Sequence, residues 1–170
     1  MDVVLFTISS VIFGFHEHHR RELRIQAEAD KCILYGACHC KAIKFKFKTP
    51  RYSSVWKCNC SICNMKKNDH VVVKEDDFEL IKGSENLIEY KFNTKVARHK
   101  FCKICGVQSF YHPRSNPTGI GITYTCIDQS MIEKAHVHFE FHDFDGQNWE
   151  KFYKTEGGAA IRACSKEIIH

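Results

Sequence analysis

Seven of the ten cysteines in this 170-residue chain fall into three tight groups whose spacing suits metal binding. Neighbouring thiolates with such spacing can converge on one ion, and the clustering argues against a disulfide framework. The groups are C-x-C at Cys38 and Cys40, C-x-C-x-x-C at Cys58, Cys60 and Cys63, and C-x-x-C at Cys102 and Cys105.

The two cysteine pairs predict one closed structural zinc site. Cys38 and Cys40 lie in ACHC, and Cys102 and Cys105 lie in FCKICG, where Gly106 allows a turn that points backbone N–H groups at sulfur. Four thiolates satisfy the tetrahedral preference of zinc. Such a site would join the start of the domain to its middle and contribute about 10 kcal/mol or more of folding free energy. The alternative is that these are free buried thiols.

The group of three cysteines predicts a second metal site, which can be open or closed. Three thiolates cap one face of an ion, and the fourth position can hold water, a substrate thiol or a distant side chain. An open position is typical of catalytic zinc and a closed one of structural zinc, and the spacing favours neither. One cluster of all seven sulfurs is disfavoured by their wide separation along the chain. The candidates for a distant fourth ligand are Cys126, His39, His70, His99 and His112.

The single cysteines, the net charge and the absent motifs exclude few classes of function. Cys32, Cys126 and Cys164 stand alone, and we expect each to behave as a small buried hydrophobic residue. Zinc thiolates persist best in a reducing compartment, which favours the cytoplasm or nucleus. The net charge of +5 permits an anionic ligand or an acidic protein partner. No phosphate-binding or dinucleotide-binding motif is present, and no basic patch interleaved with aromatic residues indicates nucleic-acid binding.

The elements that must position these cysteines are mainly strands. Ile43, Phe45 and Phe47 alternate with lysines, which predicts a half-buried strand. Similar short runs, separated by Gly, Asn, Asp and Pro, continue to about residue 145 without a helical period. A helix is predicted over residues 148–155, with Gly157 positioned to end it. We therefore expect a mostly β, antiparallel domain with zinc knuckles and short terminal helices over residues 32–155, followed by a C-terminal tail at 156–170.

Residues 1–31 are predicted to form an apolar tail and a polar helix ahead of the domain. The apolar run over residues 3–15 is shorter than the ~20 residues that a membrane-spanning helix needs. Asp2 precedes this run, where a signal peptide would carry positive charge. We expect this segment to pack on the domain rather than to enter a membrane.

Two further stretches carry polar groups that can bind ligands. The His-rich run at residues 136–145 alternates apolar and polar residues, which predicts an edge strand with a polar face rather than another metal site. The loop at residues 109–117 contains Arg114, which can bind a carboxylate. The flanking Pro113 and Pro117 slightly favour a simple turn.

The order and separation of the three cysteine groups resemble the glutathione-dependent formaldehyde-activating family, whose domain is shared with centromere protein V. The resemblance covers roughly residues 32–155 and looks closer to centromere protein V than to the bacterial enzymes. Bacterial members often carry His at the position of Asn59. The stretches that carry the resemblance are GACHCKAIKF, CNCSICNMKKNDH, FELIKGSENLIEYKFNT, HKFCKICGVQSFYHPRSNP and GQNWEKF.

This resemblance implies a β-tent fold with two Zn²⁺ ions, one closed on the four paired cysteines and one open on the group of three. It implies carbon–sulfur lyase activity on the hydroxymethyl adduct of glutathione, with a glutathione-like thiol entering the open position. Binding to zinc deprotonates a thiol and so produces the nucleophile at neutral pH. No general base stands out in the sequence. The alternative is a non-enzymatic zinc module that binds a protein partner, associated with chromosomes or microtubules as centromere protein V is.

Overall fold

The computed structural model describes residues 30–165, which fold mainly into β-strands. The chain divides after Lys31, and almost all described residues belong to the unit that begins at Cys32. The apolar tail and the polar helix predicted over residues 1–31 lie outside the described residues, except for Asp30, which is in a turn, and Lys31, which begins the first strand. None of the helices described between residues 30 and 165 is long and apolar enough to cross a membrane.

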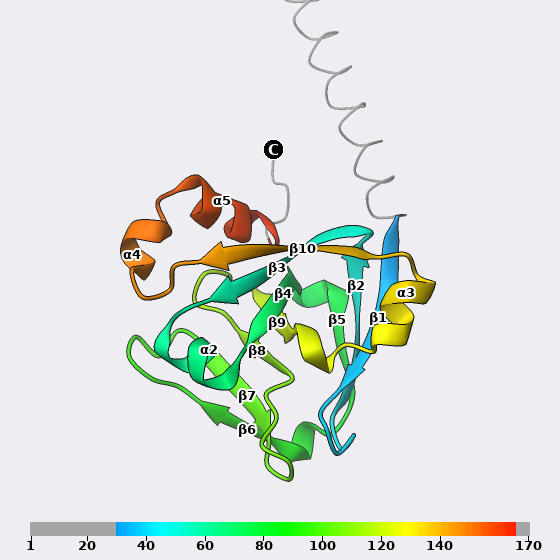
Figure 1. Cartoon of the computed structure of the whole chain (residues 1–170). Coiled ribbons are helices and arrows are strands. Elements are labelled where there is room, and N and C mark those ends of the chain that lie inside the picture. Colours follow the sequence, from blue (N-terminus) through cyan, green and yellow to red (C-terminus); the bar gives the residue numbers. More distant parts are fainter. Residues whose placement is uncertain (1–29, 166–170) are drawn as a thin grey trace, which may run out of the picture. The chain divides into compact units, whose positions relative to one another are not determined.

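The strands of the described region form two sheets (Figure 1). The smaller sheet has the order β1-β2-β5, with β1 at Lys31–Ala37, β2 at Lys44–Pro50 and β5 at Phe78–Lys82. The larger sheet has the order β10-β3-β4-β9-β8-β7-β6. Its strands are β10 (His138–Phe144), β3 (Tyr52–Cys58), β4 (Asp69–Lys74), β9 (Gly119–Thr123), β8 (Phe110–His112), β7 (Arg98–Cys102) and β6 (Leu87–Tyr90).

The strand pairing confirms the mostly β, antiparallel-rich fold and adds one parallel pair. Strands β2 and β5, and the neighbours from β3 to β6 in the larger sheet, pair antiparallel. Strand β10 instead runs parallel to β3, with His138 beside Tyr52 and Phe144 beside Cys58. Because the two strands end at the same edge, the chain that follows β10 lies next to the group of three cysteines.

The main hydrophobic core lies between the two sheets and confirms the predicted strand alternation. Ile43, Phe45 and Phe47 are buried, and the Phe45 ring packs edge-on against Phe110 from the larger sheet, with 5.8 Å between centroids. A smaller second core lies on the other side of the larger sheet and contains Trp56, Val72, Phe144 and Ile161. The two cores fix the larger sheet from both faces.

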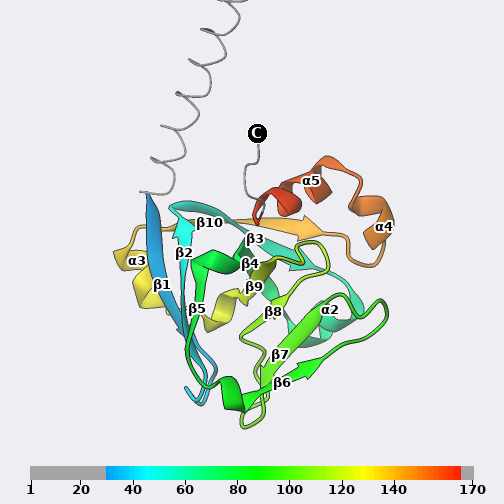
Figure 2. The same cartoon turned by 180° about the vertical axis from the view of Figure 1, so that it is seen from behind.

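Two short α-helices interrupt the described strand series, although the sequence shows no helical period there. They are α2 (Ser61–Lys66) and α3 (Gln129–Lys134). Six residues are fewer than two helical turns, so they cannot display a period of 3.6. Asp128 caps the start of α3, and its carboxylate accepts a hydrogen bond from the Ser130 N–H at 3.0 Å. Helix α3 lies beside β1 in both views (Figures 1 and 2).

The helix predicted over residues 148–155 is shorter than expected and a second helix follows it, so the role assigned to Gly157 is wrong. Helix α4 covers Trp149–Phe152, and α5 covers Glu156–Ala163 (Figure 1). Gly157 lies in the first turn of α5, because Thr155 caps that helix by accepting a hydrogen bond from the Gly158 N–H. Ile161 of α5 enters the second core. The folded region therefore extends beyond residue 155, where the sequence predicted a tail.

The His-rich stretch forms the edge strand β10, as predicted. His138 stacks on Tyr52 with 5.2 Å between ring centroids, and His142 lies against Trp56. Within residues 30–165, no group of possible metal ligands includes a residue of this strand. The polar face of an edge strand accounts for the histidines.

Candidate metal centres

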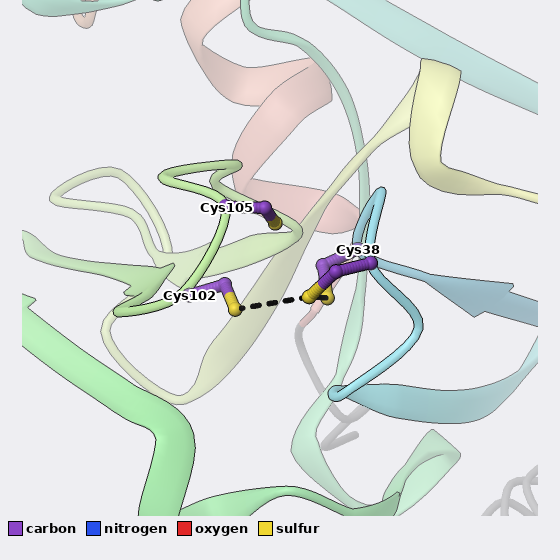
Figure 3. Close-up of side chains that lie close together, drawn as sticks. Cys38, Cys102 and Cys105 are labelled. Atoms are coloured by element: carbon purple, nitrogen blue, oxygen red, sulfur yellow. Dashed lines mark hydrogen bonds between the residues drawn. The ribbon is translucent and has the colours of Figure 1, made fainter.

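The two cysteine pairs meet at one place, which we call the four-cysteine site. The Sγ atoms of Cys38, Cys40, Cys102 and Cys105 lie within 4.8 Å of one another, and Figure 3 shows three of these side chains directed at a common point. The Cys38–Cys40 and Cys40–Cys102 sulfur distances are 3.6 Å and 3.7 Å. Zn–S bonds of 2.3 Å in a tetrahedron separate the sulfurs by about 3.8 Å. This donor set fits a closed zinc site.

Two tight turns position the sulfurs of the four-cysteine site. Cys38 follows β1, and its Sγ accepts a hydrogen bond from the Ile43 N–H at 3.3 Å. Cys102 ends β7, and the turn after it closes where the Gly106 N–H donates to the Cys102 carbonyl at 2.8 Å. Gly106 has a φ of 73°, a left-handed conformation that glycine adopts without strain. The site thus joins a turn of the smaller sheet to the end of a strand in the larger one.

Cys58, Cys60 and Cys63 form a second group, the three-cysteine cluster. Their sulfurs also lie within 4.8 Å of one another. Cys58 ends β3, Cys60 immediately precedes α2, and Cys63 lies in the first turn of that helix. Residues three apart share one face of a helix, so the short helix α2 directs Cys60 and Cys63 to the same side.

The thiols of the three-cysteine cluster influence one another strongly. Contact with Cys58 lowers the pKa of the Cys60 thiol, whereas contact with Cys60 raises the pKa of Cys58. Contact with Cys58 likewise raises the pKa of the buried Cys63. Three adjacent thiolates repel one another, so a cation is needed to hold all three deprotonated. The chemistry of this donor set fits a metal ion.

No fourth ligand among residues 30–165 completes the three-cysteine cluster. The possible metal-ligand groups of that region are two separate sets of sulfurs, which rules out the single seven-sulfur cluster there. None of the five candidates joins either set. The ring nitrogens of His70 contact Asn68 and Tyr111, and His99 Nδ1 lies 3.3 Å from Gln108 Oε1. The three sulfurs therefore leave one side of the cluster open.

The loop that carries the three-cysteine cluster is tied to the chain after β10. The Asn59 amide donates to Asp145 Oδ1 at 3.1 Å, and the Gln147 N–H donates to Asn59 Oδ1 at 2.9 Å. Gly146 lies between these partners, where a Cβ atom would come within 2.5 Å of Cys58 Sγ. The absence of a side chain at Gly146 lets this segment approach the sulfurs.

A cavity of about 760 Å³ adjoins the open side of the three-cysteine cluster. Its walls come from α2, β4, β8, the loops after β6 and β8, and the segment that contains α4. Besides the three cysteines, it is lined by Ser61, Ile62, His70, Phe92, Asn93, Thr94, Ala97, His99, Tyr111, Pro113, Arg114, Ser115, Phe144, Gly146, Gln147, Asn148, Trp149, Glu150, Lys151 and Ile161.

The cations that line this cavity do not include Lys57, which directly precedes Cys58 in the sequence. Arg114 and Lys151 line the cavity. The Arg114 guanidinium lies 3.6 Å from the centre of the Trp149 ring and forms an ion pair with Glu150. Lys57 instead pairs with the exposed Asp143. The proline-containing loop after β8 therefore supplies a cation to the cavity.

Three buried rings form one wall of the cavity, an arrangement that could not be predicted from the sequence. Tyr111 Oη lies 2.8 Å from His70 Nε2, and the Tyr111 ring stacks on His99 with 5.1 Å between centroids. Burial lowers the pKa of His70 to about 4 and raises the pKa of Tyr111 well above its usual value. His70 is therefore neutral near pH 7. These residues come from three strands, so only the pairing of the strands brings them together.

Comparison with known proteins agrees with the cysteine pattern. The family model of the glutathione-dependent formaldehyde-activating enzyme matches residues 33–144, which include all seven clustered cysteines. A crystal structure of a Rhodobacter sphaeroides protein is similar, with a TM-score of 0.53 and 29% sequence identity over 56% of this chain and 88% of that chain. The closer likeness to centromere protein V stays a prediction. The chain belongs to the glutathione-dependent formaldehyde-activating family.

Proposed function

We propose that this protein binds two zinc ions and makes or breaks the carbon–sulfur bond in the hydroxymethyl adduct of a glutathione-like thiol. The observation that carries the proposal is the open side of the three-cysteine cluster, which faces a cavity of about 760 Å³. Family membership supports the same chemistry.

The two metal sites would have different roles. The four-cysteine site has a complete tetrahedral donor set and would stabilise the fold. The three-cysteine cluster has one open side, and zinc bound there would lower the pKa of an incoming thiol. Cys58, Cys60 and Cys63 would hold the ion and are themselves held by α2 and by the contact of Asn59 with Asp145.

The cavity residues account for recognition of an anionic thiol. Glutathione carries a carboxylate at each end, and Arg114 and Lys151 supply positive charge in the cavity wall. An arginine can bind a carboxylate through two parallel hydrogen bonds. Glu150 pairs with Arg114 in the structure. A substrate carboxylate would therefore compete with Glu150 for the guanidinium.

The apolar walls of the cavity would protect the reacting atoms from water. Phe92, Phe144 and Trp149 line it beside the three-cysteine cluster. Exclusion of water strengthens the electrostatic interactions that hold a charged substrate and a thiolate. The cavity would thus orient the adduct with its sulfur at the cluster and its carboxylate at Arg114.

The test of this proposal is a zinc count followed by an exchange measurement. Zinc per chain is determined by mass spectrometry, and exchange between the adduct and free glutathione plus formaldehyde is followed by NMR with and without protein. Two zinc ions and faster exchange would support the proposal. Absence of acceleration at high concentration of the two-zinc protein would overturn it. An acidic protein partner and a cytoplasmic or nuclear location stay predictions from the sequence.

A further inference from the structure

Tyr111 and His70 form a hydrogen-bonded pair whose direction can be assigned from the structure. His70 Nδ1 lies 3.1 Å from the Asn68 carbonyl oxygen. A carbonyl only accepts hydrogen bonds, so Nδ1 carries the ring proton and Nε2 is free of one in the neutral imidazole. Tyr111 Oη, at 2.8 Å, therefore donates its proton to Nε2. The lone pairs of the Tyr111 oxygen stay available to accept another hydrogen bond.

The pair is held firmly in place. Tyr111 is 5% exposed and His70 is 2% exposed. The Tyr111 ring lies between His99, which stacks on it, and His70, which meets it at an interplanar angle of 86°. The Tyr111 ring also packs directly on the backbone of Gly121, because a Cβ atom at Gly121 would come within 2.5 Å of the ring. Such packing gives Tyr111 a single orientation.

The pair is also coupled to the three-cysteine cluster through Asn68. The backbone carbonyl of Asn68 fixes His70, and its side-chain amide donates to Cys63 Sγ at 3.8 Å. The Asn68 N–H donates to the Cys63 carbonyl at 3.0 Å. Tyr111 and His70 line the same cavity as the three cysteines. A substrate whose sulfur sits at the cluster would therefore be close to the pair.

We propose that Tyr111 is the catalytic residue that takes the hydroxyl proton of the adduct, with His70 as the positioning residue that accepts the proton of Tyr111. This inference rests on the proposed function and supplies the general base that the sequence did not reveal. The orientation of the hydrogen bonds supports it, because they run in one direction from Tyr111 to His70 to the Asn68 carbonyl.

Cleavage moves one proton from the adduct and breaks its carbon–sulfur bond. The hydroxymethyl O–H bond breaks, and its proton moves to Tyr111 Oη as the phenolic proton of Tyr111 moves to His70 Nε2. The electron pair of the broken O–H bond forms the second carbon–oxygen bond of formaldehyde. The carbon–sulfur bond breaks, and its electron pair leaves on the sulfur as a thiolate. The proton held by His70 returns through Tyr111 when the thiol is released, and formation of the adduct is the reverse sequence.

The first test is the Tyr111→Phe variant, which keeps the ring and removes the hydroxyl. We expect kcat to fall about 100-fold or more, as is typical for loss of a general acid or base. KM and the zinc content stay unchanged. Tyr124→Phe is the matched control, because Tyr124 packs on Phe139 and Phe141 and does not line the cavity. A Tyr111→Phe enzyme with wild-type kcat would overturn the inference.

The His70→Gln variant tests the pair independently and covers the case in which Tyr111→Phe loses zinc or unfolds. A glutamine amide oxygen can accept the Tyr111 hydrogen bond but cannot hold the proton. We expect a fall in kcat of about 100-fold at unchanged KM and zinc content. Retention of wild-type kcat in His70→Gln would show that His70 is only structural and would overturn its assigned role.

A spectroscopic measurement tests the pair without reference to activity. In ¹⁵N NMR spectra of the zinc-loaded protein, His70 should show a protonated Nδ1 and an unprotonated Nε2, and the Nε2 signal should shift in Tyr111→Phe. A proton on Nε2 would overturn the inference. An inactive wild-type protein with two zinc ions would overturn the proposed function itself, whereas an active wild type with equally active variants overturns only the role of Tyr111 and His70.

Discussion

The side chain of Asn59 donates a hydrogen bond to the carboxylate of Asp145 at 3.1 Å, across 86 residues of sequence. Asn59 lies between two cysteines of the three-cysteine cluster, and Asp145 follows directly after β10. The spacing of the sulfurs therefore depends on a segment from the far end of the domain.

Replacing Asp145 with Ala should weaken metal binding at the three-cysteine cluster. Loss of a residue that hydrogen-bonds a metal ligand costs about 10-fold to 100-fold in metal affinity. Asp145 acts one contact further away, through Asn59 in the loop of the cluster, so we expect a loss of about 10-fold. Competition with a chromogenic chelator measures the affinity of the weaker site. Asp143→Asn, two residues earlier on β10, is the control, because Asp143 contacts the exposed Lys57. Equal affinities in the two variants would contradict the prediction.

The two groups of cysteines should respond differently to loss of one sulfur. Cys102 is fully buried in the four-cysteine site, and structural zinc contributes on the order of 10 kcal/mol to small zinc modules, so Cys102→Ser should unfold the domain at room temperature. Cys60→Ser should keep the fold, lose one zinc ion and abolish the exchange reaction. Circular dichroism melting and zinc analysis measure both. If Cys60→Ser unfolds the domain, the three-cysteine cluster is structural.

Arg114 and Glu150 should have opposite effects on substrate affinity. Arg114→Ala removes the cation expected to bind a substrate carboxylate and should raise KM for the glutathione adduct about tenfold, equivalent to roughly 1.4 kcal/mol. Glu150→Gln removes the competing carboxylate and should lower KM. Steady-state kinetics at two salt concentrations measure both effects. Lys154→Ala, outside the cavity lining, is the control, and an unchanged KM in Arg114→Ala would exclude this role.

The buried His70 should make the fold less stable in mild acid. Its folded pKa is about 4, below the usual 6.5, because of burial, and the groups around it are Asn68, Tyr111, His99 and Cys60. Between these values the unfolded chain binds a proton that the folded chain does not, so stability falls as the pH drops from 6.5 to 4. The loss is on the order of 3 kcal/mol.

Comparison with His70→Gln isolates this contribution from that of the cysteines. Glutamine does not titrate, so the variant should lose about 3 kcal/mol less than wild type over the same pH range. Urea unfolding at a series of pH values, with both proteins in the same buffers, measures the difference. Parallel stability curves for the two proteins would show that His70 does not destabilise the folded state in acid.

The sequence predicted the features that depend on local spacing. The cysteine pattern predicted both sulfur groups, and the alternation of Ile43, Phe45 and Phe47 predicted a buried strand face. The wall formed by Tyr111 and His70 was not predictable, because β4 and β8 are joined only through β9 between them. The parallel pairing of β10 with β3 was not predictable either, because the alternation of apolar and polar residues does not indicate the direction of a strand. Helix α2 was too short to show a period.

The parallel pairing of β10 with β3 also sets an order in which the two sites can be completed. During synthesis, the last ligand of the four-cysteine site is available once Cys105 has left the ribosome. The wall beside Cys58 needs Asp145 and the helix that begins at Trp149, which leave the ribosome after Cys105. A nascent chain can therefore bring the sulfurs of the four-cysteine site together before it can complete the wall of the three-cysteine cluster.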